Sequence, residues 1–520
     1  MAAGAEALDE GVIRSAEDEG WVKYSRFKLH LRPKWAYTKE INEAVAPLPP
    51  GKDVVEVFGD FYAYLVHCTL TFIQESHKNG SDLLSSCQDH IEYIISHPNG
   101  WEGTQQKKLR RAAVYAGLIP ENDKAHERIH FVTEGEASLH FCIDHGLSPH
   151  IKDGEGVMIV DAGGGTVDIS TYSRTSDNQS FEEIATPACV FAGSVFVTRR
   201  AERFLKKKLK GSQYEGEAEL IADCFDKTTK HRFRNADEPA YIKFGTMRDT
   251  DPQLDIRSGQ LRLVGSDVVS FFEPSASSIL REIENQRLKA RRSVSSIFLV
   301  GGFADNTWLF LQMRERVEPS GISLFRPANS PLNKAVADGA ISFYIHNIVS
   351  ARVAKYNYGL RMHTVFNSLD PEHARRKGQV YTRPDGKKVL GGQYGIILPK
   401  DARVSKTQEF RRSFKKLYQN VSHMNTILLD VLCYLGHKSD PRWMETEPEN
   451  YSTLFTVTAN TSTAAKALKP LRTEDGGLYF RLDLDIIIFF GRTELKAQLC
   501  WKEDGVEKRG PAQILHERDL

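Results

Sequence analysis

The sequence predicts an α/β protein that continues into a mostly β C-terminal domain. The first observation is a repeated order of strand, turn and helix between residues 91 and 350, which is typical of an α/β domain. The second is a pair of apolar runs, at residues 157–160 and 296–300, that each end in a glycine turn. The third is a change near residue 350, after which short strands alternate with turn signals such as Pro384-Asp385-Gly386. We therefore place a β-rich domain at residues 351–520.

The first glycine turn joins two predicted strands, and the functional interpretation rests on it. Its tip consists of Gly163, Gly164 and Gly165. Because glycine has no Cβ, a bulky anion can come within hydrogen-bonding distance of the main-chain N–H groups there. Asp161 and Thr166 flank the tip, and a carboxylate in this position suits hydrated Mg²⁺. A glycine hairpin without a ligand needs no carboxylate on both sides, so Asp168 favours a binding site.

Length, charge and cysteine content limit the function. At 520 residues the chain has room for several domains. Its 69 Lys and Arg residues against 68 Asp and Glu residues argue against general binding of nucleic acids or of anionic membranes. No apolar run approaches the roughly 18 residues of a membrane helix. The seven cysteines are scattered without a C-x-x-C pair, which favours a reduced, cytoplasmic protein.

The N-terminal part is expected to begin with a disordered acidic tail at residues 1–20, which lacks the basic start and apolar core of a signal peptide. The periodicity then predicts a strand at 27–31, a helix at 54–74, a strand at 91–96, a helix at 104–116 and a strand at 128–133. In the first of these strands Lys28 points away from the apolar face. Glu134 lies at a strand-to-helix junction, where α/β proteins place ligand-facing groups, although a first-turn acid favoured by the helix dipole explains it equally well.

The remaining elements follow the first glycine turn. Helices are predicted after Gly193 as far as 209, at 220–233 and at 268–288, with strands at 241–244 and 261–264. At the second turn, Gly301 and Gly302 follow a buried strand, and Asp305 or Asn306 caps a helix that runs to about Val317. A helix N-terminus behind a glycine turn can bind phosphate or the edge of a nucleoside, although this motif alone is common. In the β-rich domain, strands are expected at 393–399, 452–458, 478–482, 486–490 and 497–501, with one helical insertion at 407–436.

Taken together and in this order, these segments resemble the heat-shock protein 70 family, and more closely its divergent branch without the chaperone lid. The hairpin from Asp161 to Asp168 is similar to the second phosphate-binding hairpin of the actin-like ATPase fold. Val300-Gly301-Gly302-Phe303 resembles the family's adenosine motif, and residues 334–340 resemble its closing helix. Thr133-Glu134-Gly135-Glu136-Ala137 is similar to its Glu-Pro-x-Ala-Ala junction, and Arg26-Phe27-Lys28 to the strand that carries its catalytic lysine.

The resemblance implies an actin-like ATPase (ribonuclease-H-like) fold, with two nucleotide-binding lobes at residues 21–190 and 191–350. It implies ATP or ADP with Mg²⁺ as ligands, the metal being held through water by Asp161. The residues implied to hold the phosphates are Gly163, Gly164, Gly165, Thr166 and Gly193, and those on the adenosine side are Gly301, Gly302 and Phe303. The implied catalytic set is Lys28, Glu134, Asp161 and Thr166. Within that set, Lys28 and Glu134 would position the attacking water.

The resemblance also implies a chaperone whose C-terminal domain holds unfolded or client proteins, but the sequence departs from the family pattern. No sequence of the type Gly-x-Asp-x-Gly-Thr-Thr precedes Lys28, so the first phosphate loop is missing and ATP hydrolysis is expected to be impaired. Gly135 replaces the usual proline, and residues 350–355 replace the acidic-apolar interdomain linker. Two alternatives stay open: a non-catalytic scaffold on the same fold, and a sugar or polyol kinase, in which the β-rich domain has no place.

Overall fold

The computed structural model describes residues 2–33, 36, 38–101, 103–152, 154–176, 180–327, 331–490, 494–511 and 513–514. The structure is α/β, with several sheets, as the sequence predicts. The chain divides into two compact units, the first formed by Met1–Trp101 with Gln105–Ile348 and the second by Glu102–Thr104 with Val349–Leu520. Among the described residues, no helix combines the length and the apolar character that crossing a membrane requires.

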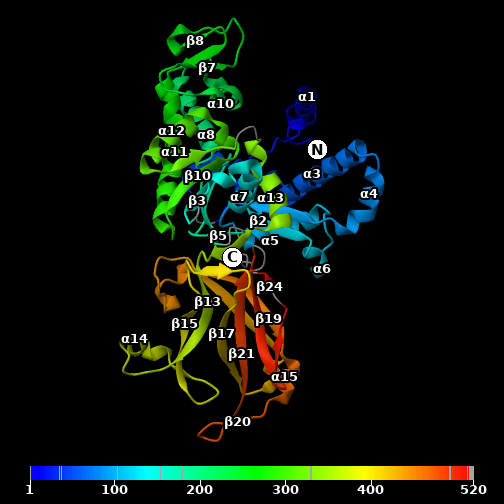
Figure 1. Ribbon diagram of the computed structural model, residues 1–520, viewed down its shortest axis with the longest axis vertical. Helices are drawn as coiled ribbons and strands as arrows, with labels where there is room; N and C mark the ends of the chain where they lie inside the picture. The colour runs from blue at the N-terminus through cyan, green and yellow to red at the C-terminus, as the bar shows by residue number, and fades with distance from the viewer. Residues whose placement is uncertain are drawn as a thin grey trace. The chain divides into compact units, whose positions relative to one another are not determined.

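The first unit is built on a mixed sheet that contains β3 (Gly156–Ala162) and β10 (Val294–Val300) (Figure 1). Both of these central strands are fully buried. The strands of the sheet, in spatial order, are β11 (Ser323–Phe325), β10, β3, β4 (Val167–Arg174) and β5 (Phe181–Glu183), with β6 (Ala188–Val190) also paired to β4. β10 runs parallel to β3, and β3 is antiparallel to β4 across the first glycine turn. Every residue of β3 and β10 is buried, which explains why the apolar runs within these strands show no alternation.

The longer helices of the first unit lie close to their predicted positions. They are α3 (Val54–Ser76), α5 (Thr104–Tyr115), α7 (Glu134–Cys142), α8 (Ser194–Lys208), α11 (Gly265–Lys289), α12 (Thr307–Val317) and α13 (Ala335–His346). Local sequence sets their ends. Asp53 and Glu56 form a capping box at α3, and the side chain of Asn306 accepts a hydrogen bond from the N–H of Leu309 at the start of α12. Gly117, with a φ of 73°, lies in the left-handed conformation just after α5.

Helices cover both faces of the central sheet, and the pleat of β4 shows which helix lies on which face. Successive side chains of a strand point to opposite sides, so Asp168 and Thr171 face opposite ways. Ser138 of α7 donates a hydrogen bond to Asp161, the cross-strand partner of Asp168. Thr171 donates a hydrogen bond to Gln286 of α11. Thus α7 lies on the face that carries the two aspartates, and α11 covers the other face.

A separate two-stranded sheet holds β1 (Tyr93–His97) and β2 (Ile129–Thr133), which pair in parallel. Both strands were predicted from their apolar runs. β2 leads directly into α7, so Glu134 is the first residue of that helix. Apolar side chains of this sheet, of α3 and of α5 share one core, to which Phe58, Trp101 and Phe131 contribute large buried rings.

A third sheet of the first unit is small and antiparallel. It consists of β7 (Ala240–Lys243), β9 (Gln260–Leu263) and β8 (Ile256–Arg257), in that spatial order. The segment that precedes it, predicted as one helix, divides into α9 (Ala218–Cys224), the π-helical η8 (Phe225–Thr229) and α10 (Lys230–Arg232). β7 and β9 alternate between buried and exposed residues, so one face of the sheet packs inward and the other faces solvent.

The N-terminal region differs from its prediction in two places. Residues 1–20 were expected to be disordered, but α1 (Glu10–Glu19) forms there, because Asp9 caps its first turn and Gly20 ends it in the left-handed conformation. Residues 27–31 were expected to form a strand and instead form the 3₁₀ helix η2 (Phe27–Leu31). The apolar residues of η2 are buried by α3 and by the glycine turn rather than by a neighbouring strand, as the edge-to-face contact of Phe27 with Phe58 shows.

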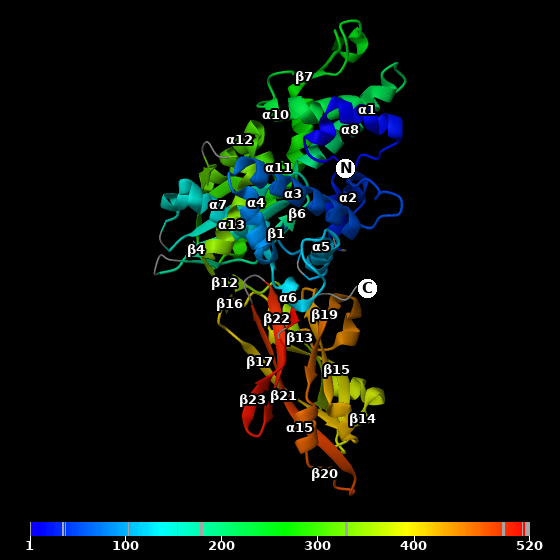
Figure 2. The ribbon, with the colours of Figure 1, turned by 90° about the vertical axis from the view of Figure 1, so that its right-hand side faces the viewer.

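The second unit is mostly β, as predicted, and two sheets share its core (Figure 2). One sheet has the order β14 (Tyr381–Thr382), β15 (Lys388–Leu398), β13 (Asn357–Val365), β18 (Thr426–Tyr434) and β19 (Tyr451–Asn460). The other has the order β17 (Phe410–Tyr418), β21 (Leu478–Phe490), β22 (Leu495–Glu503) and β23 (Val506–Arg509), with β20 (Leu471–Arg472) and β24 (Gln513–Ile514) at its margins. The short strands β12 (Val349–Val353) and β16 (Arg403–Ser405) pair with each other.

The helical insertion predicted at 407–436 is wrong. β17 and β18 lie there, and β17 pairs with β21 over nine residue pairs, from Phe410↔Ile488 to Tyr418↔Phe480. Alternate residues of β17 are exposed, which satisfies the two-residue period of a strand and not the period of a helix. The two strands predicted at 478–482 and 486–490 are one continuous strand, β21.

Candidate functional site

The two glycine turns meet at one end of the central sheet of the first unit. β3 and β10 are parallel neighbours, and Asp161 pairs with Val300, so the turns that follow these strands emerge side by side. Gly301 has a φ of +90°, and a Cβ built on it would lie 2.4 Å from Oδ1 of Asp161. Only glycine fits there, because any side chain would be strained and would meet the carboxylate. In open α/β sheets, ligands bind beyond the carboxyl ends of the strands, which is where both turns lie.

The N-terminus of α8 closes against the first glycine turn. The N–H groups of Gly193, Ser194 and Val195 donate to the carbonyl oxygens of Gly165, Gly163 and Gly164, over 3.3, 3.2 and 2.9 Å. A Cβ on Gly193 would lie 2.3 Å from the carbonyl oxygen of Gly164, so this position also requires glycine. The first N–H groups of a helix are normally available to an anion. Here these three are already used by the turn itself.

Leu29 of η2 covers one side of the same turn. A Cβ on Gly165 would lie 2.9 Å from Cδ2 of Leu29, and the leucine side chain is only 3% exposed. At Gly164, by contrast, an added Cβ would meet no atom within 4 Å. The turn is therefore open at Gly164 and covered by an apolar side chain at Gly165.

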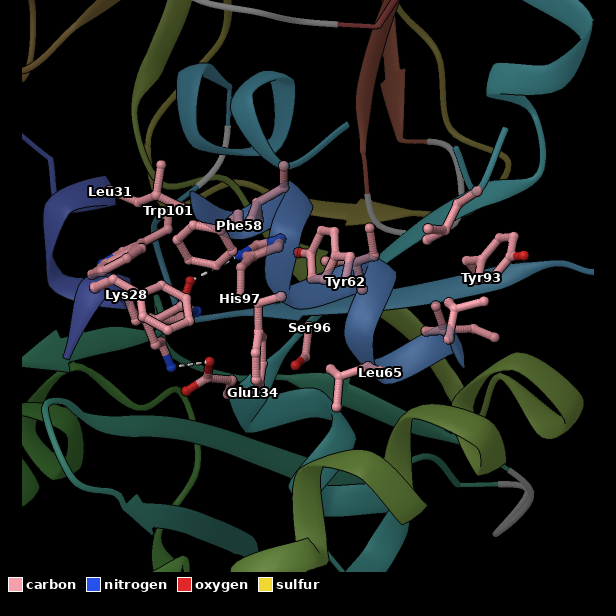
Figure 3. Close-up of a pocket in the computed structure, with 18 residues that line it drawn as sticks. Lys28, Leu31, Phe58, Tyr62, Leu65, Tyr93, Ser96, His97, Trp101 and Glu134 are labelled. Atoms are coloured by element: carbon pink, nitrogen blue, oxygen red, sulfur yellow. Dashed lines mark hydrogen bonds and ion pairs between the residues drawn. The ribbon is translucent and has the colours of Figure 1, made fainter. Parts of the chain in front are cut away.

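Lys28 and Glu134 form an ion pair beside the turn (Figure 3). The Nζ of Lys28 lies 2.5 Å from Oε1 of Glu134, although the two residues are 106 positions apart in the chain. The side chain of Lys28 is 45% exposed and that of Glu134 is 12% exposed. Burial lowers the pKa of the Lys28 ammonium, but the charge and hydrogen bond of Glu134 outweigh it and hold that pKa above its ordinary value. Lys28 is therefore charged at neutral pH.

Asp161 is a buried carboxyl group with an unusually high pKa. Burial raises its pKa to about 7, and the negative charge of Glu134 adds to the effect. The hydroxyl of Ser138 donates to Oδ2 of Asp161 over 3.0 Å, and this bond and the charge of Lys28 act in the opposite direction. A small change in local charge at neutral pH therefore changes the protonation state of Asp161.

Asp168 faces the same side of the sheet, and its pKa is also raised. Burial first, and then Glu134, raise its pKa well above the ordinary value, while Lys28 and the N–H of Asn99 lower it. The N–H of Asn99 donates to Oδ1 over 2.6 Å. Oδ2 is buried and has no hydrogen-bond partner among the described residues. Three carboxylates thus surround one ammonium group, and this imbalance favours either protonation or a bound cation.

The donor set can be tested against Mg²⁺. Within the described ranges, no group of three or more His, Cys, Asp or Glu side chains is placed to hold a metal ion directly. Mg²⁺ keeps several of its waters and is usually bound through one or two carboxylates. The partnerless oxygen of Asp168 and the carboxylate of Asp161 fit such a hydrated ion, with no further protein ligand required.

A pocket of about 430 Å³ opens next to the Lys28–Glu134 pair (Figure 3). It runs along β1 and is walled by apolar side chains of α3 and η2, among them Phe27, Phe58, Tyr62 and Leu65. The sequence showed no motif for it. The sequence of α3 is richer in apolar residues than the structure buries, and Leu65, for example, is 43% exposed.

The structure brings together most of the residues that the sequence singled out. Lys28, Glu134, Asp161 and the turn glycines at 163–165, 193 and 301 lie around one end of the central sheet. Thr166 is 3% exposed, and its carbonyl oxygen accepts from the N–H of Gly163 to close the turn.

Phe303 does not fit its expected role as readily. It lies in η10 (Gly302–Asp305), is only 4% exposed and packs against Phe272, so its ring belongs to the core rather than to an open adenosine surface. Sequence reasoning also missed Ser138 and Asn99, which hold the two aspartates. Both are ordinary polar residues whose contacts arise from strand and helix packing, so no local pattern marks them.

A scan against protein-family models and a search of curated proteins each found no match to this chain.

Proposed function

We propose that this chain binds a Mg²⁺–adenine nucleotide weakly between its two glycine turns, on an actin-like fold of the kind found in the heat-shock protein 70 family. The observation that carries the proposal is the meeting of the two turns at Asp161, beside the Lys28–Glu134 pair. The motifs that suggested the resemblance lie far apart in the sequence. Their convergence on one site supports a shared ligand.

The chain's own residues would divide the binding as follows. Asp161 and Asp168 would hold the hydrated metal, and Mg²⁺ would supply the positive charge that the site lacks. The phosphates would lie against Gly163, Gly164, Thr166 and Gly193, with Gly164 offering the open approach. Gly301 and Gly302 would face the nucleoside. No side chain fits at Gly301, because its Cβ would meet the carboxylate of Asp161. Lys28 and Glu134, which contact each other beside the turn, would orient a water molecule.

Hydrolysis by this chain is expected to be negligible. Phosphoryl transfer depends on preorganised donors that hold the phosphates in line. Three N–H groups at the start of α8 are engaged with the turn, and Leu29 covers Gly165. A site with few free donors binds phosphate without stabilising the transition state, and losing even one such donor costs about 10²–10³ in rate.

Calorimetric titration of ATP and ADP in the presence of Mg²⁺ tests the proposal. Gly164→Val should abolish binding, because the new side chain would fill the open side of the turn. Gly216→Val is the matched control, since Gly216 also has open space around its Cβ position but lies in η7 (Glu215–Glu217), outside the candidate site. Equal binding by the two variants, or no saturable binding by the unmodified chain, would contradict the proposed site.

A non-catalytic scaffold is the second candidate, and the position of Leu29 favours it. An apolar side chain that seals a glycine turn gives the turn a structural purpose without any ligand. In that case the second unit would be the part that holds client proteins in the cytoplasm. Both alternatives expect negligible hydrolysis, so nucleotide binding separates them: saturable binding of ATP or ADP that Gly164→Val abolishes would rule out a turn with a structural purpose alone.

A further inference from the structure

A second pocket lies in the first unit beside the small sheet of β7, β9 and β8. Its lining is mainly cationic, whereas carboxylates outnumber the ammonium group beside the glycine turns. Its volume is about 390 Å³, and it is formed where the helical segment of η8 and α10 ends and the chain turns into β7. The size matches that of pockets that hold small molecules, which are typically about 300–1,000 Å³. None of the residues implied to bind nucleotide lines it.

The pocket has a buried floor and a cationic rim. Thr229, Phe233 and Ala240 are all less than 9% exposed and provide the floor. Arg232 and Arg234 lie on the rim and are exposed. A closed floor beneath exposed charges allows a ligand to be enclosed on one side while its charged group meets the rim.

The two guanidinium groups are available for a ligand. Neither Arg232 nor Arg234 makes a hydrogen bond, an ion pair or a ring contact with any described residue. Lys243 adds a third cation, whose Nζ donates to the carbonyl oxygen of Ser258. Among the described residues of the lining, Glu238 is the one acid, and its carboxylate accepts from Asn235. The cations of this lining therefore outnumber its carboxylates.

Helix electrostatics explain only part of this arrangement. A cation at the C-terminal end of a helix is favoured by the helix dipole, which accounts for Arg232 as the last residue of α10. Arg234 and Lys243 lie outside the helix and gain nothing from it. The exposed ring of Tyr241, a residue of β7, adds an apolar surface to the lining.

We infer that this pocket binds a small phosphorylated molecule, with its phosphate group held by Arg232 and Arg234. Guanidinium groups match the geometry of phosphate oxygens and donate two hydrogen bonds at once. The phosphate dianion balances the two unpaired cations, and the rest of the molecule has room over Tyr241 and the buried floor. This site stands independently of nucleotide binding at the glycine turns.

Calorimetric titration of the full chain with inorganic phosphate and with glycerol phosphate, at constant ionic strength, tests the inference. Both should bind saturably, and Arg232→Gln/Arg234→Gln should weaken both by at least about tenfold, because each lost charge-assisted hydrogen bond is worth about that factor. Because both positions are exposed, the double Gln variant should remain folded, and Arg232→Lys/Arg234→Lys should keep part of the affinity. Circular dichroism confirms that each variant is folded.

Two controls separate this pocket from other sources of phosphate binding. Arg262 is the cross-strand partner of Tyr241 on the exposed face of the same sheet, but it does not line the pocket. Arg262→Gln should therefore leave the affinity unchanged. Gly164→Val alters the glycine turn and should also leave it unchanged. Absence of saturable binding, equal binding by the double Gln variant, or equal loss in either control would overturn the inference.

Discussion

Leu29 lies over Gly165, so close that a Cβ on the glycine would come within 2.9 Å of the leucine Cδ2. This contact joins η2 to the first glycine turn and places Lys28, the preceding residue, against Glu134. One short helical turn therefore both completes and restricts the candidate site. It supplies the ammonium group and also covers part of the surface that a phosphate would use.

Leu29→Ala is expected to tighten nucleotide binding, because it exposes Gly165. Deleting a buried leucine side chain costs about 2–5 kcal/mol of stability, so binding must be measured under conditions where the variant remains folded. Leu31→Ala is the matched control: Leu31 lies in the same element, is equally buried, and packs into the core of α3 and α5. It should lose similar stability without any gain in affinity. Unchanged or weaker binding by Leu29→Ala would show that Leu29 does not obstruct the site.

Asp161→Asn is expected to change the pH dependence of stability. The folded pKa of about 7 lies above the ordinary value of 3.8, so the folded state holds the proton more tightly than the unfolded state. The contribution of Asp161 to the free energy of unfolding is therefore fully present below about pH 4, and it is lost as the pH rises to about 7. Asparagine does not titrate. Between pH 5 and pH 8 the free energy of unfolding of the variant should therefore rise, relative to that of the unmodified chain, by on the order of 2–3 kcal/mol, at about 1.4 kcal/mol per pH unit.

Urea unfolding of both proteins across this pH range provides the measurement. Mg²⁺ should reduce the difference at pH 8, because a bound cation compensates the ionised carboxylate. Parallel profiles of unfolding free energy against pH for the two proteins would show that the pKa of Asp161 is not raised in the folded state.

Lys28→Met is expected to destabilise the first unit more at pH 8 than at pH 5. At the higher pH the carboxylates around it are ionised, and they lose the one cation that acts on them within the part of the chain that the structure describes. At the lower pH Asp161 is protonated, so removal of the ammonium group leaves less repulsion between the neighbouring carboxylates. Adding Glu134→Gln should restore part of the loss at pH 8. Lys52→Met serves as the control, since Lys52 pairs with Asp60 at the surface and its effect should be small at both pH values. Thermal unfolding of the four proteins decides between these outcomes.

Gly301→Ala is expected to cost at least about 2 kcal/mol of stability. The substitution combines a φ of +90° with a Cβ position 2.4 Å from Oδ1 of Asp161 and 2.5 Å from the carbonyl oxygen of Ala162. Gly164→Ala should change stability by less than about 1 kcal/mol, because its Cβ position is open. Equal unfolding midpoints in urea for the two variants would show that the turns do not meet as closely as the structure places them.

Local structure in most of the first unit could be predicted from the residues of each segment. The apolar runs at 157–160 and 296–300 could only be buried strands, because they are too short for helices and lack alternation. Caps such as Asn306 and the glycine after α5 marked helix ends through hydrogen bonds within a few residues. Where such local signals were weak the prediction was wrong, as in β17, whose strand character depends on its pairing with β21.

The surroundings of the candidate site depend on contacts between segments that lie far apart in the sequence. Glu134 meets Lys28, Asn99 meets Asp168 and Leu29 meets Gly165 across 106, 69 and 136 positions of sequence. The alternation of Phe27, Leu29 and Leu31 suggested a strand, because apolar spacing does not reveal which surface will bury the side chains. The raised pKa of Asp161 likewise depends on burial and on neighbouring charges that only folding brings near. Residue types within one segment fix its local geometry, whereas burial, charge balance and access to a ligand are properties of the packed chain.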